Sequence, residues 1–105
     1  MNAIVIFCTV PKKDDAKKIS DALIKESLAA CVSTVDKVHS IFAWDNEICS
    51  ENELLLIIKT RLENFDKIEA VIKALHPYNV PEIIALPIIT GSKDYLDWVE
   101  HETQQ

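Results

Sequence analysis

The sequence predicts one α+β domain whose strands and helices follow the order β-α-β-β-α-β, with a short helix at the C-terminus. Three observations support this fold class. Apolar runs of strand length occur near both ends of the chain, two segments carry apolar residues at helical spacing, and a long stretch without proline or glycine has the features of a hairpin. The length of 105 residues corresponds to a single domain, residues 1–105.

The first strand and the first helix are predicted near the N-terminus. Residues 3–8 are apolar at every position, which is typical of a central strand covered on both faces. Asp14 and Asp15 suit a helix N-terminus because their negative charges are stabilised by the positive end of the helix dipole. Apolar residues then recur at helical spacing as far as Leu23.

A long hairpin is predicted over residues 31–60. Asp45 and Asn46 form its two-residue turn, because asparagine tolerates the positive φ that such turns require. The apolar alternation of the first arm slips at Asp36 and Lys37, where we expect a β-bulge.

The tip of this hairpin is expected to extend beyond its own domain. Each arm would span roughly 45 Å at about 3.3 Å per residue, whereas a domain of this size has a radius of gyration of ~13 Å. The tip is apolar on both faces, with Phe42, Trp44 and Cys49 on one and Ile41, Ala43 and Ile48 on the other. An isolated ribbon of this kind is marginally stable, so we expect another chain to cover it.

The C-terminal half is predicted to contain two helices and one strand. Asn64 can cap a second helix that continues through an apolar stripe to Leu75. Residues 82–89 read as a strand, and Pro87 places that strand at a sheet edge because proline cannot donate to a neighbour. Ser92 is suited to cap the last helix.

This element order is that of the ferredoxin-like arrangement, with the first and third strands in the centre of the sheet. Two main helices can cover only one face of such a sheet. Because the central strands are apolar on both faces, we expect a homo-oligomer that covers the second face. The alternative is that the last helix folds over that face.

Composition excludes several classes of function. The net charge of -6 and the scattered basic residues argue against a nucleic-acid partner. No apolar run approaches ~18 residues and no signal peptide is visible, so we expect a cytoplasmic protein without a membrane span. The three cysteines lack metal-motif spacing. A chain with one glycine has no glycine-rich phosphate loop, so an enzyme is not expected.

Several motifs, in order along residues 4–99, resemble the CutA divalent-cation tolerance family. The most specific are Leu28-Ala-Ala-Cys-Val32 and His76-Pro-Tyr-Asn-Val-Pro-Glu-Ile83. Asn46 departs from the glycine that is usual there, but asparagine can also adopt the left-handed conformation.

The resemblance implies a ferredoxin-like protomer in a tight homotrimer, similar in architecture to the PII signalling proteins. In that family, strands pair between subunits and each hairpin reaches a neighbour. The family is associated with copper and other divalent cations, and no reaction is firmly established for it. The resemblance therefore implies a role in divalent-cation tolerance without established catalysis.

Cys8 and His76 are the candidate metal ligands. The resemblance implies a copper site here, since some relatives use the matching cysteine and a His-His pair, of which the first histidine is Leu75 in this chain. Thiolate and imidazole suit copper or zinc. The alternative is structural: Cys8 is a small core residue and His76 a connector residue bonded to backbone.

A second group of residues is a candidate ligand cleft. It comprises Trp44, Glu53, Lys59, Tyr78 and Glu82. One interpretation is a PII-like sensor that binds a small anionic metabolite between subunits through Lys59. The other is an intersubunit ion pair, since a lone buried ammonium is costly unless it is paired.

Overall fold

The structure is a computed structural model that describes residues 1–104. Its element order is β1 (Ala3–Val10), α1 (Lys13–Lys25), β2 (Cys31–Trp44), β3 (Glu47–Arg61), a 3₁₀ turn (Leu62–Asn64), α2 (Phe65–Leu75), β4 (Ile84–Pro87) and α3 (Lys93–Glu102). The predicted α+β class and the order of the elements are confirmed.

The four strands form one antiparallel sheet in the order β2-β3-β1-β4. The prediction that the first and third strands are central is therefore confirmed. β4 is an edge strand and is shorter than the predicted residues 82–89. Pro87 pairs with Ile4 there, with no further strand beyond it in the described sheet, as proline requires.

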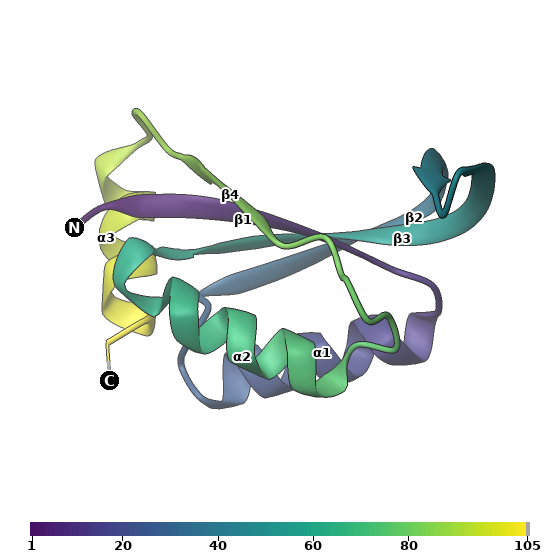
Figure 1. The fold of residues 1–105 in the computed structure, drawn as a ribbon. Coiled ribbons are helices and arrows are strands. Elements are labelled where there is room, and N and C mark those ends of the chain that lie inside the picture. Colours follow the sequence, from purple (N-terminus) through teal and green to yellow (C-terminus); the bar gives the residue numbers. More distant parts are fainter. Residues whose placement is uncertain (105) are drawn as a thin grey trace.

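The core lies between one face of the sheet and the two main helices, which Figure 1 shows on the same side of the sheet. Alternate residues of β1 and β3 point into it, because successive side chains of a strand face opposite ways. Residues without any exposed surface include Ile6, Cys8, Leu56 and Ile58 from the strands and Ile19, Leu23, Ile68 and Ile72 from the helices. Full burial of each large aliphatic side chain contributes about 1.5–3 kcal/mol.

The predicted turn and bulge of the hairpin are both confirmed. Asp45 and Asn46 have φ of 51° and 63°, the left-handed values that a primed two-residue turn needs. The register shifts between Val35 and Val38, and Lys37 has φ of 62°. Two residues of β2 thus stand opposite one residue of β3, which is a β-bulge.

The hairpin does not extend straight away from the domain. Figure 1 shows that its end curves toward the side of the sheet opposite α1 and α2. The chain measures 44 × 25 × 22 Å along its principal axes. The tip nevertheless remains exposed, with Ile41 70%, Trp44 56% and Ile48 85% accessible in the single chain.

Asn64 precedes α2 but does not cap it as predicted, because its side chain makes no capping hydrogen bond. Its Nδ2 instead donates to the backbone oxygens of Leu28 (3.1 Å) and Thr103 (3.3 Å). Thr60 Oγ1 donates to the same Leu28 oxygen at 2.6 Å. Ser92 does cap α3, since its Oγ accepts from the Tyr95 amide at 3.3 Å.

Helix α3 lies at one end of the sheet (Figure 1). Arg61 holds it there, with Nε 3.0 Å from Thr103 Oγ1 and Nη2 2.8 Å from the Glu100 oxygen. Apolar residues on the sheet face opposite α1 and α2, here called the open face, remain partly or largely accessible. Their exposed members are Val35, Ile84 and Leu86.

Replacing Asn64 with alanine should lower the free energy of unfolding by about 1–3 kcal/mol, because two buried carbonyls would lose a donor. Urea unfolding at neutral pH measures this difference. Asn2→Ala is the matched control, since Asn2 is exposed and no side-chain bond of it is recorded among the described residues. Equal losses in both variants would contradict the role assigned to Asn64.

Candidate functional site

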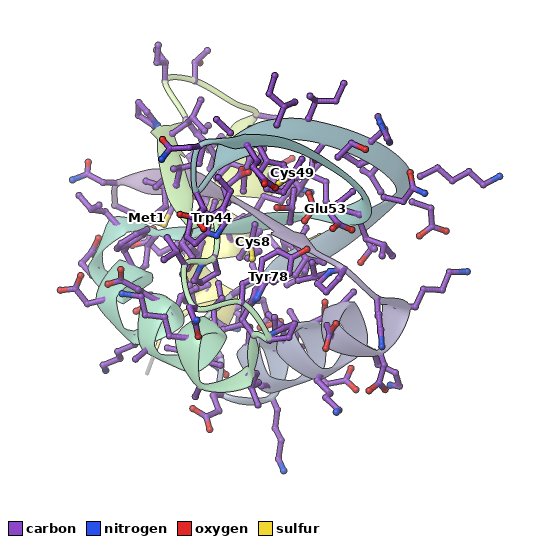
Figure 2. All side chains as sticks on the ribbon, turned by 45° about the vertical axis from the view of Figure 1, so that its right-hand side comes forward. Met1, Cys8, Trp44, Cys49, Glu53 and Tyr78 are labelled. Carbon is purple, nitrogen blue, oxygen red and sulfur yellow. The ribbon has the colours of Figure 1, made fainter. Side chains whose placement is uncertain are left out.

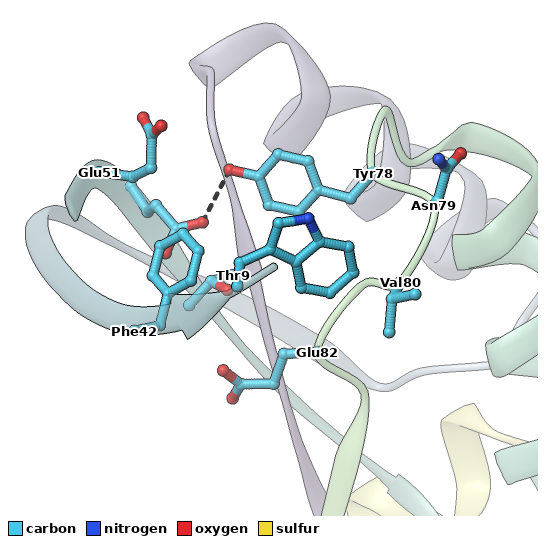
Figure 3. Close-up of a pocket in the computed structure, with 9 residues that line it drawn as sticks. Thr9, Phe42, Glu51, Tyr78, Asn79, Val80 and Glu82 are labelled. Carbon is cyan, nitrogen blue, oxygen red and sulfur yellow. Dashed lines mark hydrogen bonds between the residues drawn. The ribbon is translucent and has the colours of Figure 1, made fainter. Parts of the chain in front are cut away.

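A pocket of about 410 Å³ lies between the curled end of the hairpin and the connector that joins α2 to β4 (Figure 3). The residues that line it are Thr9, Phe42, Trp44, Glu51, Glu53, Tyr78, Asn79, Val80 and Glu82. It therefore contains four of the five residues of the predicted cleft.

The bulge decides which hairpin side chains reach this pocket. Beyond it, Val38 stands opposite Glu53 and Phe42 opposite Cys49. Phe42 and Trp44 consequently share a face with Glu51 and Glu53, because opposed and alternate residues lie on one face. Without the extra residue of the bulge, the side chains on the opposite face of β2 would point toward the pocket instead.

Glu53 and Tyr78 form the central contact of the pocket. The Tyr78 hydroxyl donates to Glu53 Oε2 at 2.9 Å, and Glu53 is only 6% exposed. Burial, followed by the hydrogen bond and charge of Glu53, raises the pKa of Tyr78 to about 12. The phenol is therefore a neutral hydrogen-bond donor at physiological pH.

His76 is buried next to this pocket with both ring nitrogens engaged. Its Nε2 lies 2.8 Å from the Thr9 oxygen, and its Nδ1 lies 3.0 Å from the Tyr78 amide nitrogen. Since a carbonyl only accepts and an amide only donates, these bonds require the neutral tautomer protonated at Nε2. In this conformation His76 has no nitrogen lone pair free for a metal.

Cys8 has no exposed surface, and its Sγ lies 3.8 Å from the Thr9 oxygen. Burial, with the nearby charges of Glu82 and Glu53, raises the pKa of the Cys8 thiol to about 12. Figure 2 shows Cys8, Glu53 and Tyr78 grouped near the curled end of the hairpin. The structure thus brings Cys8 and His76 to the same backbone oxygen, that of Thr9.

Lys59 is the member of the predicted cleft that does not line the pocket. It lies on the open face, where its Nζ donates to Ser33 Oγ at 3.1 Å and contacts Cys31 Sγ at 3.7 Å. Within the described chain, its nearest recorded partners are therefore neutral side chains from β2.

Sequence reasoning missed five of the residues that line the pocket: Thr9, Phe42, Glu51, Asn79 and Val80. The predicted bulge was the sequence signal for Phe42, because a bulge changes which side chains of the first arm point to each face of the sheet.

Among residues 1–104, no group of three or more histidine, cysteine, aspartate or glutamate side chains is close enough to hold a metal ion. In the same range, no helix is long and apolar enough to cross a membrane.

Comparison with known proteins identifies close relatives. The family model described as "CutA1 divalent ion tolerance protein" matches residues 4–102. The divalent-cation tolerance protein CutA of Thermus thermophilus is 48% identical over 99 residues, 94% of this chain and 96% of that protein. The chloroplastic protein CutA of Arabidopsis thaliana is 41% identical, over 97% of this chain and 56% of its own length.

Solved structures agree with these sequence matches. The Thermus thermophilus divalent cation tolerance protein superposes with a TM-score of 0.95 and 46% identity, covering 97% of this chain and 99% of that one. CutA1 from Oryza sativa superposes with a TM-score of 0.96 and 41% identity, over 100% and 96% of the two chains. This chain therefore belongs to the CutA1 divalent ion tolerance family.

Proposed function

We propose that this chain acts in divalent-cation tolerance as a non-catalytic homotrimer in the cytoplasm. Its family membership supports the link to divalent cations. The three cysteines, all free, suit a reducing compartment. The number of subunits is what the resemblance to the family implies.

The observation that carries the proposal is the open face of the sheet. Ile84 and Leu86 on β4 stand opposite Phe7 and Val5 on β1, and both are more than two-fifths exposed. The hairpin tip adds further exposed apolar residues, Ile41, Trp44 and Ile48. Large exposed apolar areas on a protein commonly mark sites of protein–protein contact, which supports self-association.

The state of Cys8 and His76 supports a non-catalytic role. A protonated thiol is a poor nucleophile, and both ring nitrogens of His76 are engaged by backbone groups. The same geometry disfavours copper binding at these two residues. The link to cations is therefore proposed to be independent of a Cys8–His76 site.

Ile84→Glu should dissociate the trimer, because it places a charge on the apolar open face. Native mass spectrometry at low micromolar concentration measures the subunit number. Ile24→Glu is the matched control, since Ile24 is 46% exposed on α1 whereas Ile84 is 51% exposed on β4. A wild-type monomer, or a trimer that survives Ile84→Glu, would contradict the proposal.

Copper titration should give the same stoichiometry for wild type, Cys8→Ser and His76→Ala, because neither side chain is available as a ligand. Isothermal titration with Cu(I) under reducing conditions measures it, and circular dichroism verifies that the variants are folded. Cys49→Ser is the control for copper bound at a partly exposed thiol near the hairpin tip. Loss of one bound copper in both Cys8→Ser and His76→Ala would place the metal at this pair.

The free energy of unfolding should fall as pH rises above the ordinary thiol pKa of 9.0. The unfolded thiol then loses its proton while the folded Cys8 keeps it until about pH 12, so high pH favours the unfolded state. By pH 10 the loss from Cys8 should be about 1 kcal/mol. Urea unfolding from neutral pH to pH 10, at fixed protein concentration, measures it.

In that series, Cys8→Ala should flatten the decline, whereas Cys49→Ala should leave it unchanged. Tyr78 acts in the same direction but begins to contribute only near its ordinary pKa of 10.0. Parallel pH profiles for wild type and Cys8→Ala would show that the thiol is not held protonated by the fold.

A further inference from the structure

A thiol, an amine and a hydroxyl meet on the open face of the sheet. Cys31 on β2 stands directly opposite Lys59 on β3. Lys59 Nζ lies 3.7 Å from Cys31 Sγ and 3.1 Å from Ser33 Oγ. The Cys31 sulfur also lies 3.7 Å from the same Ser33 oxygen. The three side chains therefore form a closed triangle of contacts in which a nucleophilic sulfur lies beside a primary amine.

The strand register holds the sulfur and the amine together. Opposed residues of neighbouring strands have Cβ atoms about 4.5–5.5 Å apart, and alternate residues of one strand lie on the same face. Lys59 also pairs with Val5 of β1, so its backbone is bonded into the sheet on both sides. Cys31 and Lys59 thus lie in the body of the sheet and not at the free end of the hairpin. Their juxtaposition is a property of the fold.

Lys59 has no anionic partner within the described chain. None of the ion pairs recorded among residues 1–104 includes it, and its recorded side-chain partners are Cys31 and Ser33. A partly buried ammonium without an anion costs free energy. A reaction that turns this amine into a neutral group therefore breaks no ion pair within the chain and removes that cost.

The other two cysteines lack such a neighbour. Cys8 is fully buried in the core, where burial and nearby carboxylates keep its thiol protonated. Cys49 lies opposite Phe42 near the hairpin tip, and no contact between it and a lysine is recorded among residues 1–104. Cys49 is partly exposed, as Cys31 is. It therefore serves as an internal control for a thiol without an adjacent amine.

We propose that Cys31 and Lys59 form a reversible oxidative link in which one oxygen atom joins the sulfur to the nitrogen, S–O–N. Hydrogen peroxide is the oxidant. Its O–O bond breaks as the Cys31 sulfur takes one oxygen, which gives a sulfenic acid and water. The Lys59 ammonium loses its extra proton to solvent. The sulfenic O–H and one N–H bond then break as the N–O bond forms. A second peroxide accepts the two electrons and two protons and leaves as two waters.

The link changes two properties of the chain. It joins positions 28 residues apart, so it constrains the unfolded chain and stabilises the pairing of β2 with β3. It also removes the positive charge of Lys59 from the open face. Because the link lies within one chain and needs only a small oxidant, it goes beyond the proposed homotrimer and does not depend on the subunit number. Two equivalents of dithiothreitol return the four electrons and release the oxygen as water.

Peptide mass spectrometry after treatment with hydrogen peroxide tests the proposal. Wild type should yield one pair of peptides joined at Cys31 and Lys59, heavier than their sum by one oxygen less two hydrogens, about 14 Da. Trypsin should no longer cleave after Lys59. Dithiothreitol should restore both original masses. Urea unfolding of the oxidised protein should shift to higher urea concentration and return after reduction.

Matched variants separate this link from general oxidation. Lys59→Arg keeps the positive charge but removes the primary amine, so the link should be lost and dimedone should trap the Cys31 sulfenic acid. Lys25→Arg makes the same change at an exposed position on α1 and should leave the yield of the link unchanged. Cys31→Ser should abolish the link, whereas Cys49→Ser should retain it. Circular dichroism verifies that each variant is folded.

Three results would overturn the inference: oxidation of Cys31 in wild type that leaves Lys59 unlinked, an equal yield of linked peptide in Lys59→Arg, or a link that lacks the oxygen atom. Native mass spectrometry of the untreated samples reports the subunit number separately. Failure of this inference is thereby distinguished from failure of the proposed homotrimer.

Discussion

The antiparallel pairing of β1 with β3 decides both what this chain buries and what it leaves open. Each residue directed at α1 and α2 alternates with one directed the opposite way. One set builds the core around Ile6 and Ile58. The other set forms the open face, which carries Lys59 at one end and Glu53 toward the other. Core, open face and pocket are therefore consequences of one strand register.

Polar groups connect the core to the rest of the molecule. The backbone oxygen of Leu28 accepts hydrogen bonds from the side chains of Thr60 and Asn64. These bonds connect the end of β3 and the start of α2 to the segment before β2. The Thr9 oxygen accepts from His76, which fastens the connector to the end of β1. These hydrogen bonds satisfy buried carbonyl groups, which would cost folding free energy if they had no donor. They also show that Asn64, the predicted helix cap, and His76, the candidate metal ligand, are both bonded to backbone groups.

Most of the fold could be predicted because its signals are local. The turn at Asp45 and Asn46 requires residues that tolerate positive φ, and the bulge at Lys37 interrupts a visible alternation. The candidate site was predicted less completely. Trp44, Glu53, Tyr78 and Glu82 were identified and line one pocket, whereas Lys59 lies outside that pocket in the single chain. The predicted cleft lies between subunits, so the grouping of Lys59 with these residues stays a prediction. The spacing of residues along the chain does not show where the side chains of a curved hairpin lie in space.

The sequence alone determined the order of the elements, the central strands and the edge position of Pro87, since each depends on residue type and periodicity. The tertiary structure decided where the hairpin curves, which partners hold Asn64 and His76, and which carboxylates face one pocket. These features depend on contacts between residues far apart in the chain. Their energies arise only when folding brings the groups together, so no local pattern encodes them.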